Sequence, residues 1–253
     1  MFRIIVVAAC LGTWAVAQPP LRYETRRFEK KTSNCVVSFE YPEITSAASP
    51  EARDRISAGI RKVLLRMTQY PPAPSHFQSL EQYATNFCGT EHAHPALEGR
   101  KVYEHKIVKF HRSTPPVFSF RCDASVDAGG AHPYGTTLYL NFDSETGKPV
   151  RLVDILRPGA LPALRSVAES RFREDHKLSA TDRLSEVSFN FPNDWFHLNE
   201  NYGIGDNALV FLFNTYEISA GAMGPTEIVI PYSDIRDLMV RDITVPGSPA
   251  RKH

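Results

Sequence analysis

Three consecutive stretches in the middle of the chain have the composition of β-strands and are joined by short turns. Residues 102–112, 117–125 and 136–142 are rich in β-branched and aromatic residues that alternate with polar ones. Pro115-Pro116 joins the first two stretches, and a turn at residues 143–148 follows the third. The helical patterns fall in separate blocks. This order predicts an α+β fold with a mostly antiparallel sheet packed against a few helices.

The N-terminal third predicts one strand and two helices. Alternation from Cys35 to Tyr41 is typical of a strand, which we expect to end at Pro42. Ser49 and Pro50 are typical of a helix start, with serine at the N-cap and proline at the first helical position. The apolar stripe of that helix consists of Ile56, Ile60, Val63, Leu64 and Met67. A second helix is predicted from about residue 75 to 87, with a stripe of Phe77, Leu80, Tyr83 and Phe87.

The C-terminal half predicts a helix over residues 161–172 and several short strands. The strands are predicted at residues 188–191, 195–198, 208–214 and 228–230. We expect the loop 199–207 to make a hairpin of the strands at 195–198 and 208–214. Ser233 is the predicted cap of a last short helix.

The first 17 residues have the pattern of a secretory signal peptide. Arg3 precedes an uncharged apolar run, and Ala15-Val16-Ala17 is a small-x-small cleavage pattern. We therefore expect a secreted or periplasmic protein, with an N-terminal arm at 18–32, one domain at 33–240 and a disordered tail at 241–253. A lipoprotein anchored through Cys10 is the alternative, because Val7-Ala8-Ala9-Cys10 is similar to a lipidation box. No later stretch is long enough to span a bilayer.

Three cysteines remain beyond this leader, and an oxidising compartment favours one disulfide among them. Cys122 shares strand parity with Phe118 and Phe120, which predicts a buried free thiol. Cys35–Cys88 is therefore the pairing we prefer. The net charge of +1 for the whole chain gives no basic surface of the kind that nucleic acid requires, so we expect no nucleic-acid partner.

Two histidine-containing segments are candidate sites. Gly129-Gly130-Ala131-His132-Pro133 lies between two predicted strands, and His132 could act as a general base or simply stabilise a tight turn. His92 and His94 could share a metal ion on a strand, with His105, His111 or His132 as a third ligand, but Gly89 and Pro95 bracket them in a loop. We expect no metal and no cofactor.

Carboxylates and aromatic residues of the middle and C-terminal strands have structural explanations. The carboxylates are Asp123, Asp143, Glu145 and Asp154, and turns favour such residues without any catalytic role. The aromatics are Trp195, Phe196, Phe211 and Phe213, which we expect in the sheet core; an exposed member would be a good glycan or protein contact.

Four segments in order carry a family resemblance. They are Val37–Pro42, Gly129–Pro133 with the turn and strand up to Leu156, Leu209–Ile218, and Gly221–Ile235. Together they resemble the RsiV-like extracytoplasmic domain family, a bacterial domain of otherwise unknown function. The motif positions that the resemblance marks are Gly129, Gly130, His132, Pro133, Tyr216, Glu217, Gly221, Pro231 and Tyr232.

The resemblance implies a cell-envelope module with an α+β fold, and lysozyme binding is a property of the anti-sigma members. The sequence shows no cytoplasmic segment before a spanning helix and no deacetylase domain, so we expect neither sigma-factor control nor deacetylase chemistry. Our hypothesis is a non-catalytic binding module whose ligand is a lysozyme-like protein or peptidoglycan. A secreted, esterase-like hydrolase using His132 is the alternative.

Overall fold

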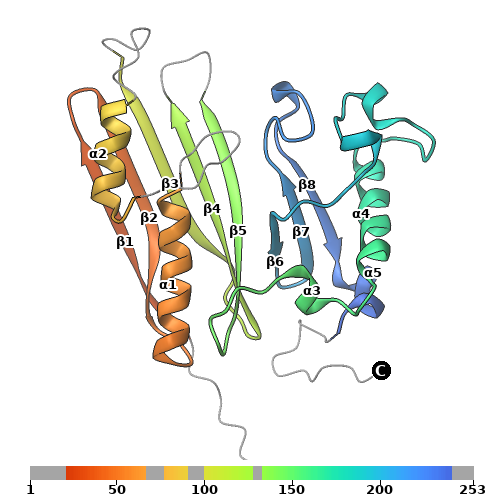
Figure 1. The fold of residues 1–253 in the computed structure, drawn as a ribbon, viewed down its shortest axis with the longest axis horizontal. Coiled ribbons are helices and arrows are strands. Elements are labelled where there is room, and N and C mark those ends of the chain that lie inside the picture. The colour runs from red at the N-terminus through yellow and green to blue at the C-terminus, as the bar shows by residue number, and fades with distance from the viewer. Residues whose placement is uncertain (1–20, 67–76, 91–99, 128–132, 241–253) are drawn as a thin grey trace, which may run out of the picture.

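Eight strands form two sheets that lie side by side in the described part of the chain (Figure 1). The computed structural model describes residues 21–66, 77–90, 100–127 and 133–240. The five-stranded sheet has the order β1 (Arg22–Lys31), β2 (Cys35–Ser46), β3 (Val102–Arg112), β4 (Val117–Asp127) and β5 (Tyr134–Asp143). The three-stranded sheet consists of β6 (Tyr202–Ile204), β7 (Ala208–Phe213) and β8 (Thr226–Pro231). The predicted α+β class is confirmed.

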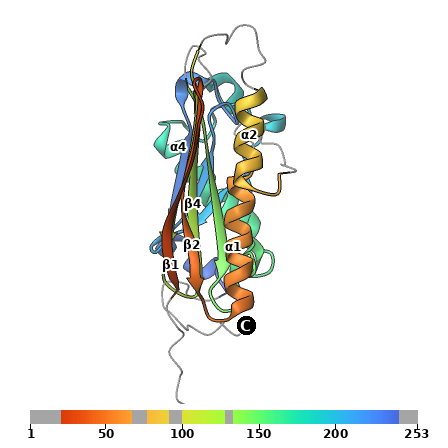
Figure 2. The ribbon, with the colours of Figure 1, turned by 90° about the vertical axis from the view of Figure 1, so that its left-hand side faces the viewer.

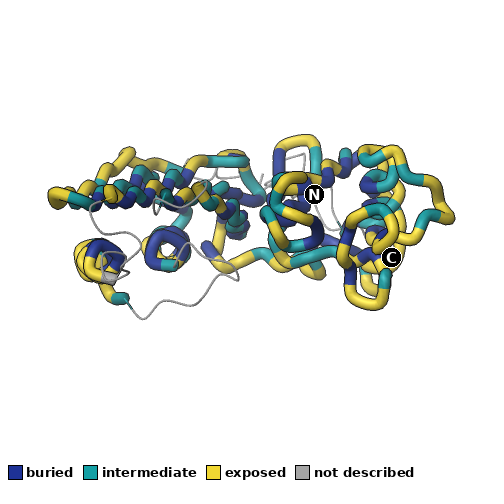
Figure 3. Tube along the Cα trace, turned by 90° about the horizontal axis from the view of Figure 1, so that it is seen from above, coloured by how far each residue is buried: buried dark blue, intermediate teal, exposed yellow. Residues whose placement is uncertain are grey.

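Both sheets are antiparallel except for one pair. β2 and β3 run parallel, and α1 (Pro50–Leu64) and α2 (Leu80–Thr90) lie in the connection between them. Figure 2 shows these two helices on one face of the five-stranded sheet. The opposite face carries many exposed residues, drawn yellow in Figure 3. α4 (Leu161–Asp175) covers one face of the three-stranded sheet, and α3 (Leu152–Ile155) and α5 (Tyr232–Ile235) both lie near its lower end in Figure 1.

The predicted start of α1 is confirmed. Ser49 is the N-cap, its hydroxyl accepts a hydrogen bond from the Ala52 backbone at 3.1 Å, and Pro50 opens the helix. Ile56 and Ile60 are buried on the face that packs against the sheet. Gly59 lies where any Cβ would meet the Phe142 ring at 2.4 Å, so glycine allows the helix to approach β5 closely.

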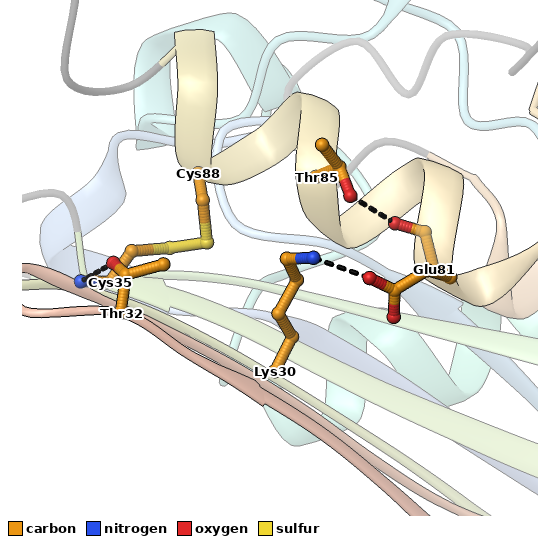
Figure 4. The surroundings of a disulfide bond; sticks show 6 residues. All are labelled: Lys30, Thr32, Cys35, Glu81, Thr85 and Cys88. Carbon is orange, nitrogen blue, oxygen red and sulfur yellow. Dashed lines mark hydrogen bonds and ion pairs between the residues drawn. A yellow bond between two sulfur atoms is a disulfide. The ribbon is translucent and has the colours of Figure 1, made fainter.

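The predicted disulfide is confirmed and fixes α2 to the sheet. Cys35 of β2 is bonded to Cys88 of α2, and Figure 4 shows the bond beside an ion pair between Lys30 and Glu81 that joins the same two parts. The Cys35 amide also donates to the Thr32 hydroxyl. Cys122 is a buried free thiol, as its strand parity predicted.

Two predictions at the N-terminus differ from the structure. Residues 22–31 of the expected arm form the edge strand β1, which pairs antiparallel with β2. Strand β2 continues past Pro42 to Ser46 and stays paired with β1 over this part. Its pairing with β3 stops at Glu40, so the residues after Glu40 have no ladder partner on the β3 side. A proline is tolerated on such an edge, where no ladder partner needs its missing N–H.

The predicted hairpin between residues 195–198 and 208–214 is wrong. Strand β7 pairs instead with β6, which lies inside the expected loop 199–207. Residues 188–191 form only an isolated bridge, Phe189 to Ser219. Ser188, Asn193 and Asp194 have positive φ values, which interrupt an extended strand. The alternating pattern arose because Phe189, Phe191 and Phe196 all pack around Phe172 of α4.

The predicted cap of the last helix is also wrong. Helix α5 begins at Tyr232 with Pro231 at the cap position, and Ser233 lies inside the helix with its hydroxyl bonded to Asp234. None of the helices in the described ranges is long and apolar enough to cross a membrane.

Candidate functional site

A groove of about 1160 Å³ runs between the C-terminal half of α1 and the three-stranded half of the molecule. Its floor is the helix-side face of β5, where Leu138 and Leu140 are half-buried. One wall carries Arg61, Lys62 and Arg66, which sequence reasoning did not single out. The opposite wall consists of Asn199, Glu200, Asn201, Tyr202, Asn214 and Glu217. This volume exceeds the roughly 300–1,000 Å³ typical of a small-molecule pocket.

Asparagine side chains close the outer edge of β5. The Asn201 amide accepts from the Tyr139 backbone N–H at 2.9 Å and donates to the Thr137 carbonyl at 2.8 Å. The Asn214 amide accepts from the Thr137 N–H at 2.7 Å. An edge strand would otherwise present unpaired peptide groups. Each amide therefore takes the place of a peptide group of a neighbouring strand.

Asn141 makes the reciprocal contact from β5 to β6. It is 8% exposed, its side-chain oxygen accepts from the Ile204 N–H at 2.9 Å, and its side-chain nitrogen donates to the Tyr202 carbonyl at 2.8 Å. The buried Arg112 guanidinium joins the sheets near the turn before β7 by donating to the Gly205 carbonyl at 2.9 Å. The two sheets are thus held together through polar groups, and Glu217 extends this network by accepting from Asn199 and from the Asn214 backbone.

A second candidate surface lies in the loops that follow α4 and β7, at one end of the three-stranded sheet (Figure 1). We define the loop-end surface as Trp195, Tyr216 and Met223, which are 68%, 42% and 45% exposed. The two loops that carry it are linked, because the Asn190 amide donates to the Ile218 carbonyl at 2.7 Å.

The backbone that presents Trp195 is held in an uncommon conformation. Asn193 and Asp194, directly before it, both have positive φ values, near +56° and +59°. Hydrogen bonds to the Asp194 carboxylate from the Ser185 amide and Arg183 fix the loop and lower the pKa of Asp194. Such conformations cost energy and concentrate at functional sites. The prediction that Trp195 lies in the core is wrong, whereas Phe196, Phe211 and Phe213 are buried as predicted.

Tyr216 has a positive φ of 72° as well, and its exposed ring packs against Gly221. A Cβ on Gly221 would approach the Tyr216 ring to 2.3 Å, so only glycine fits beside it in this arrangement. Two motif residues of the family resemblance therefore meet in one loop. Of the others, Pro231 ends β8, and the buried Tyr232 hydroxyl donates to the Gly205 carbonyl, with its pKa raised by burial.

Several predicted site residues lie outside the described residues. These are Gly129, Gly130 and His132, the pair His92 and His94, Cys10, the leader 1–17 and the tail 241–253. Pro133 directly precedes β5. His105 and His111 lie on β3, where the Nδ1 atom of the exposed His105 is 2.6 Å from the Ser38 hydroxyl. Across the described ranges, no group of three or more His, Cys, Asp or Glu side chains could hold a metal ion.

Asp143, Asp154 and Asp123 have structural partners for their carboxylates. Asp143 accepts hydrogen bonds from the backbone of Glu145 and Thr146 in its own turn. Asp154 pairs with Arg151 at 2.7 Å, and the hydrogen bond from Arg151 lowers the pKa of Asp154. Asp123 pairs with Arg121 at 2.9 Å. The Asp143 contacts agree with the turn function that the sequence suggested, whereas the ion pairs of Asp123, in strand β4, and Asp154 were not predicted.

Comparison with known proteins identifies part of the chain. A family model described as "Protein of unknown function (DUF3298)" matches residues 153–233, so the chain contains a DUF3298 domain. The structure resembles that of a DUF3298 family protein from Pseudomonas aeruginosa, with 18% identity and a TM-score of 0.68 over 91% of this chain and 99% of that one. It also resembles a DUF3298 family member from Bacteroides fragilis, with 18% identity and a TM-score of 0.67 over 87% and 93% of the two chains. At this identity the likeness shows a shared fold. No curated protein matches.

Proposed function

We propose that this chain is an extracytoplasmic binding module that holds a lysozyme-like protein at the loop-end surface. The observation that carries this proposal is the exposure of Trp195 and Tyr216 on loops whose backbone is fixed in left-handed conformations. Tryptophan and tyrosine are over-represented among the residues that dominate protein–protein binding energies. A rigid loop also loses little conformational entropy when it binds.

Two further observations support this proposal. The Cys35–Cys88 disulfide is typical of an oxidising compartment, as the leader also suggests. The loop-end surface lies within the matched DUF3298 region, and lysozyme binding is implied by the resemblance to the RsiV-like family. Wall glycan is the other ligand class of our hypothesis.

The test is calorimetric titration of the mature protein with a c-type lysozyme, with muramidase activity followed in parallel. We expect binding in the wild type and a loss of about tenfold or more in affinity in Trp195→Ala and Tyr216→Ala, the effect of removing a hot-spot side chain. Tyr23→Ala is the matched control, because Tyr23 is 49% exposed on β1, away from the loops.

Absence of binding at high micromolar concentration, or equal affinity in all three variants, would refute the proposal. The alternative hydrolase is measured in the same preparation with a chromogenic ester. Ester hydrolysis that is lost in His132→Ala would favour that function instead.

A further inference from the structure

We propose that the groove beside α1 is a separate binding site for a carboxylate-bearing oligosaccharide. This inference goes beyond the proposed function, because the groove and the loop-end surface share no residue. The groove is open to the surface, and its volume of about 1160 Å³ is above the roughly 300–1,000 Å³ of a small-molecule pocket. An oligosaccharide is a ligand of suitable size for this volume.

The basic wall of the groove has no ion-pair partner among the residues that the structure describes. Its three cations are Arg61, Lys62 and Arg66. Cations are common near a helix C-terminus, where they interact with the last carbonyl groups. Here the buried Lys106 already does this, because its amine donates to the Leu64 and Arg66 carbonyls at 2.8 and 2.5 Å. The three groove cations are therefore available to carboxylates of a ligand.

The floor and the opposite wall argue against a bound peptide strand. A peptide usually adds to an exposed sheet edge through main-chain hydrogen bonds, but the Asn201 and Asn214 amides already occupy the edge of β5. The exposed Glu200 carboxylate on the opposite wall can accept hydrogen bonds from sugar hydroxyls. The half-buried Leu138 and Leu140 offer an apolar floor to the C–H faces of sugar rings.

The experiment titrates the full mature protein with three probes. The first probe is a set of disaccharide-peptide fragments that a muramidase releases from peptidoglycan and that carry carboxylates. The second is chitohexaose, which is neutral, and the third is poly-glutamate. The variant is the double charge reversal Arg61→Glu/Lys62→Glu. Its matched control is Arg165→Glu/Lys109→Glu, which reverses one arginine and one lysine that are exposed outside the groove. Circular dichroism establishes that each variant is folded.

We expect the peptidoglycan fragments to bind more tightly than chitohexaose, and the groove reversal to weaken them by at least about tenfold. The control reversal and Trp195→Ala should leave this affinity unchanged, so failure here is distinguishable from failure of lysozyme binding. Equal affinity in the groove reversal and its control would overturn the proposal. Tighter binding of poly-glutamate than of the fragments would also overturn it, in favour of an acidic peptide.

Discussion

Replacing Asn141 by alanine tests whether side-chain amides hold the two sheets together. The substitution removes the acceptor of the Ile204 N–H and the donor to the Tyr202 carbonyl, both in the short strand β6. It also removes the acceptor of the Ser119 hydroxyl at 2.8 Å. An unsatisfied buried polar group costs about 1–3 kcal/mol. With two backbone groups left unpaired, we expect the free energy of unfolding to fall by about 2–4 kcal/mol.

Urea denaturation followed by circular dichroism measures this change, because the unfolding free energy varies linearly with urea concentration. Asn190→Ala is the matched control: Asn190 is exposed, and its side chain forms no hydrogen bond to any described residue. We expect that variant to stay within about 0.5 kcal/mol of the wild type. A loss below about 1 kcal/mol in Asn141→Ala would refute the view that these amides stabilise the junction.

Three further predictions concern stability. Cys35→Ser/Cys88→Ser should lower the free energy of unfolding by about 4 kcal/mol, because the disulfide closes a loop of 53 residues and its removal restores the entropy of that loop in the unfolded chain. Cys122→Ala is the control, because it removes a cysteine and keeps the disulfide. In thermal denaturation Gly147→Ala should cost more than about 2 kcal/mol, because φ is +65° and a Cβ would lie 2.4 Å from the Ala52 carbonyl oxygen. Gly89→Ala, in helix α2 with open space around it, should instead be neutral or stabilising. Burial lowers the pKa of His111 below its usual 6.5, so the unfolded state binds the proton more readily than the folded state. The free energy of unfolding should therefore decline as the pH falls below 6.5. This decline should be smaller in His111→Gln, and a pH profile unchanged by that substitution would contradict the account.

Local signals in the sequence were sufficient for much of the five-stranded half. Ser49 and Pro50 marked the start of α1 because capping involves neighbouring residues only. Strands β3 to β5 are long enough for their alternation to be read, and the same alternation placed Cys122 in the core. The disulfide followed from that placement. In contrast, β6 has three residues, Tyr202–Ile204, which is too short for any period to be detected.

The candidate sites were harder to predict because their residues have ordinary local roles. Arg61 and Lys62 look like the solvated side of an amphipathic helix, and only the folded chain places them across from Glu200. Asparagine is common in turns, and Asn199 and Asn201 are the reason why their segment was predicted as a loop. Trp195 shares an alternating pattern with buried phenylalanines, but the positive φ values before it turn its ring outward.

The polar junction between the sheets bears on how much of the chain forms one unit. The DUF3298 match covers residues 153–233, which hold the three-stranded sheet and α4. That region is completed from outside the match, since Asn141 supplies hydrogen bonds to β6 and Tyr139 packs against Val210 and Leu212. β5 depends in turn on Asn201 and Asn214 for its outer edge. Each sheet therefore satisfies backbone groups of the other. We propose on this ground that the predicted range 33–240, extended by the edge strand β1, acts as a single domain with the groove as its internal boundary.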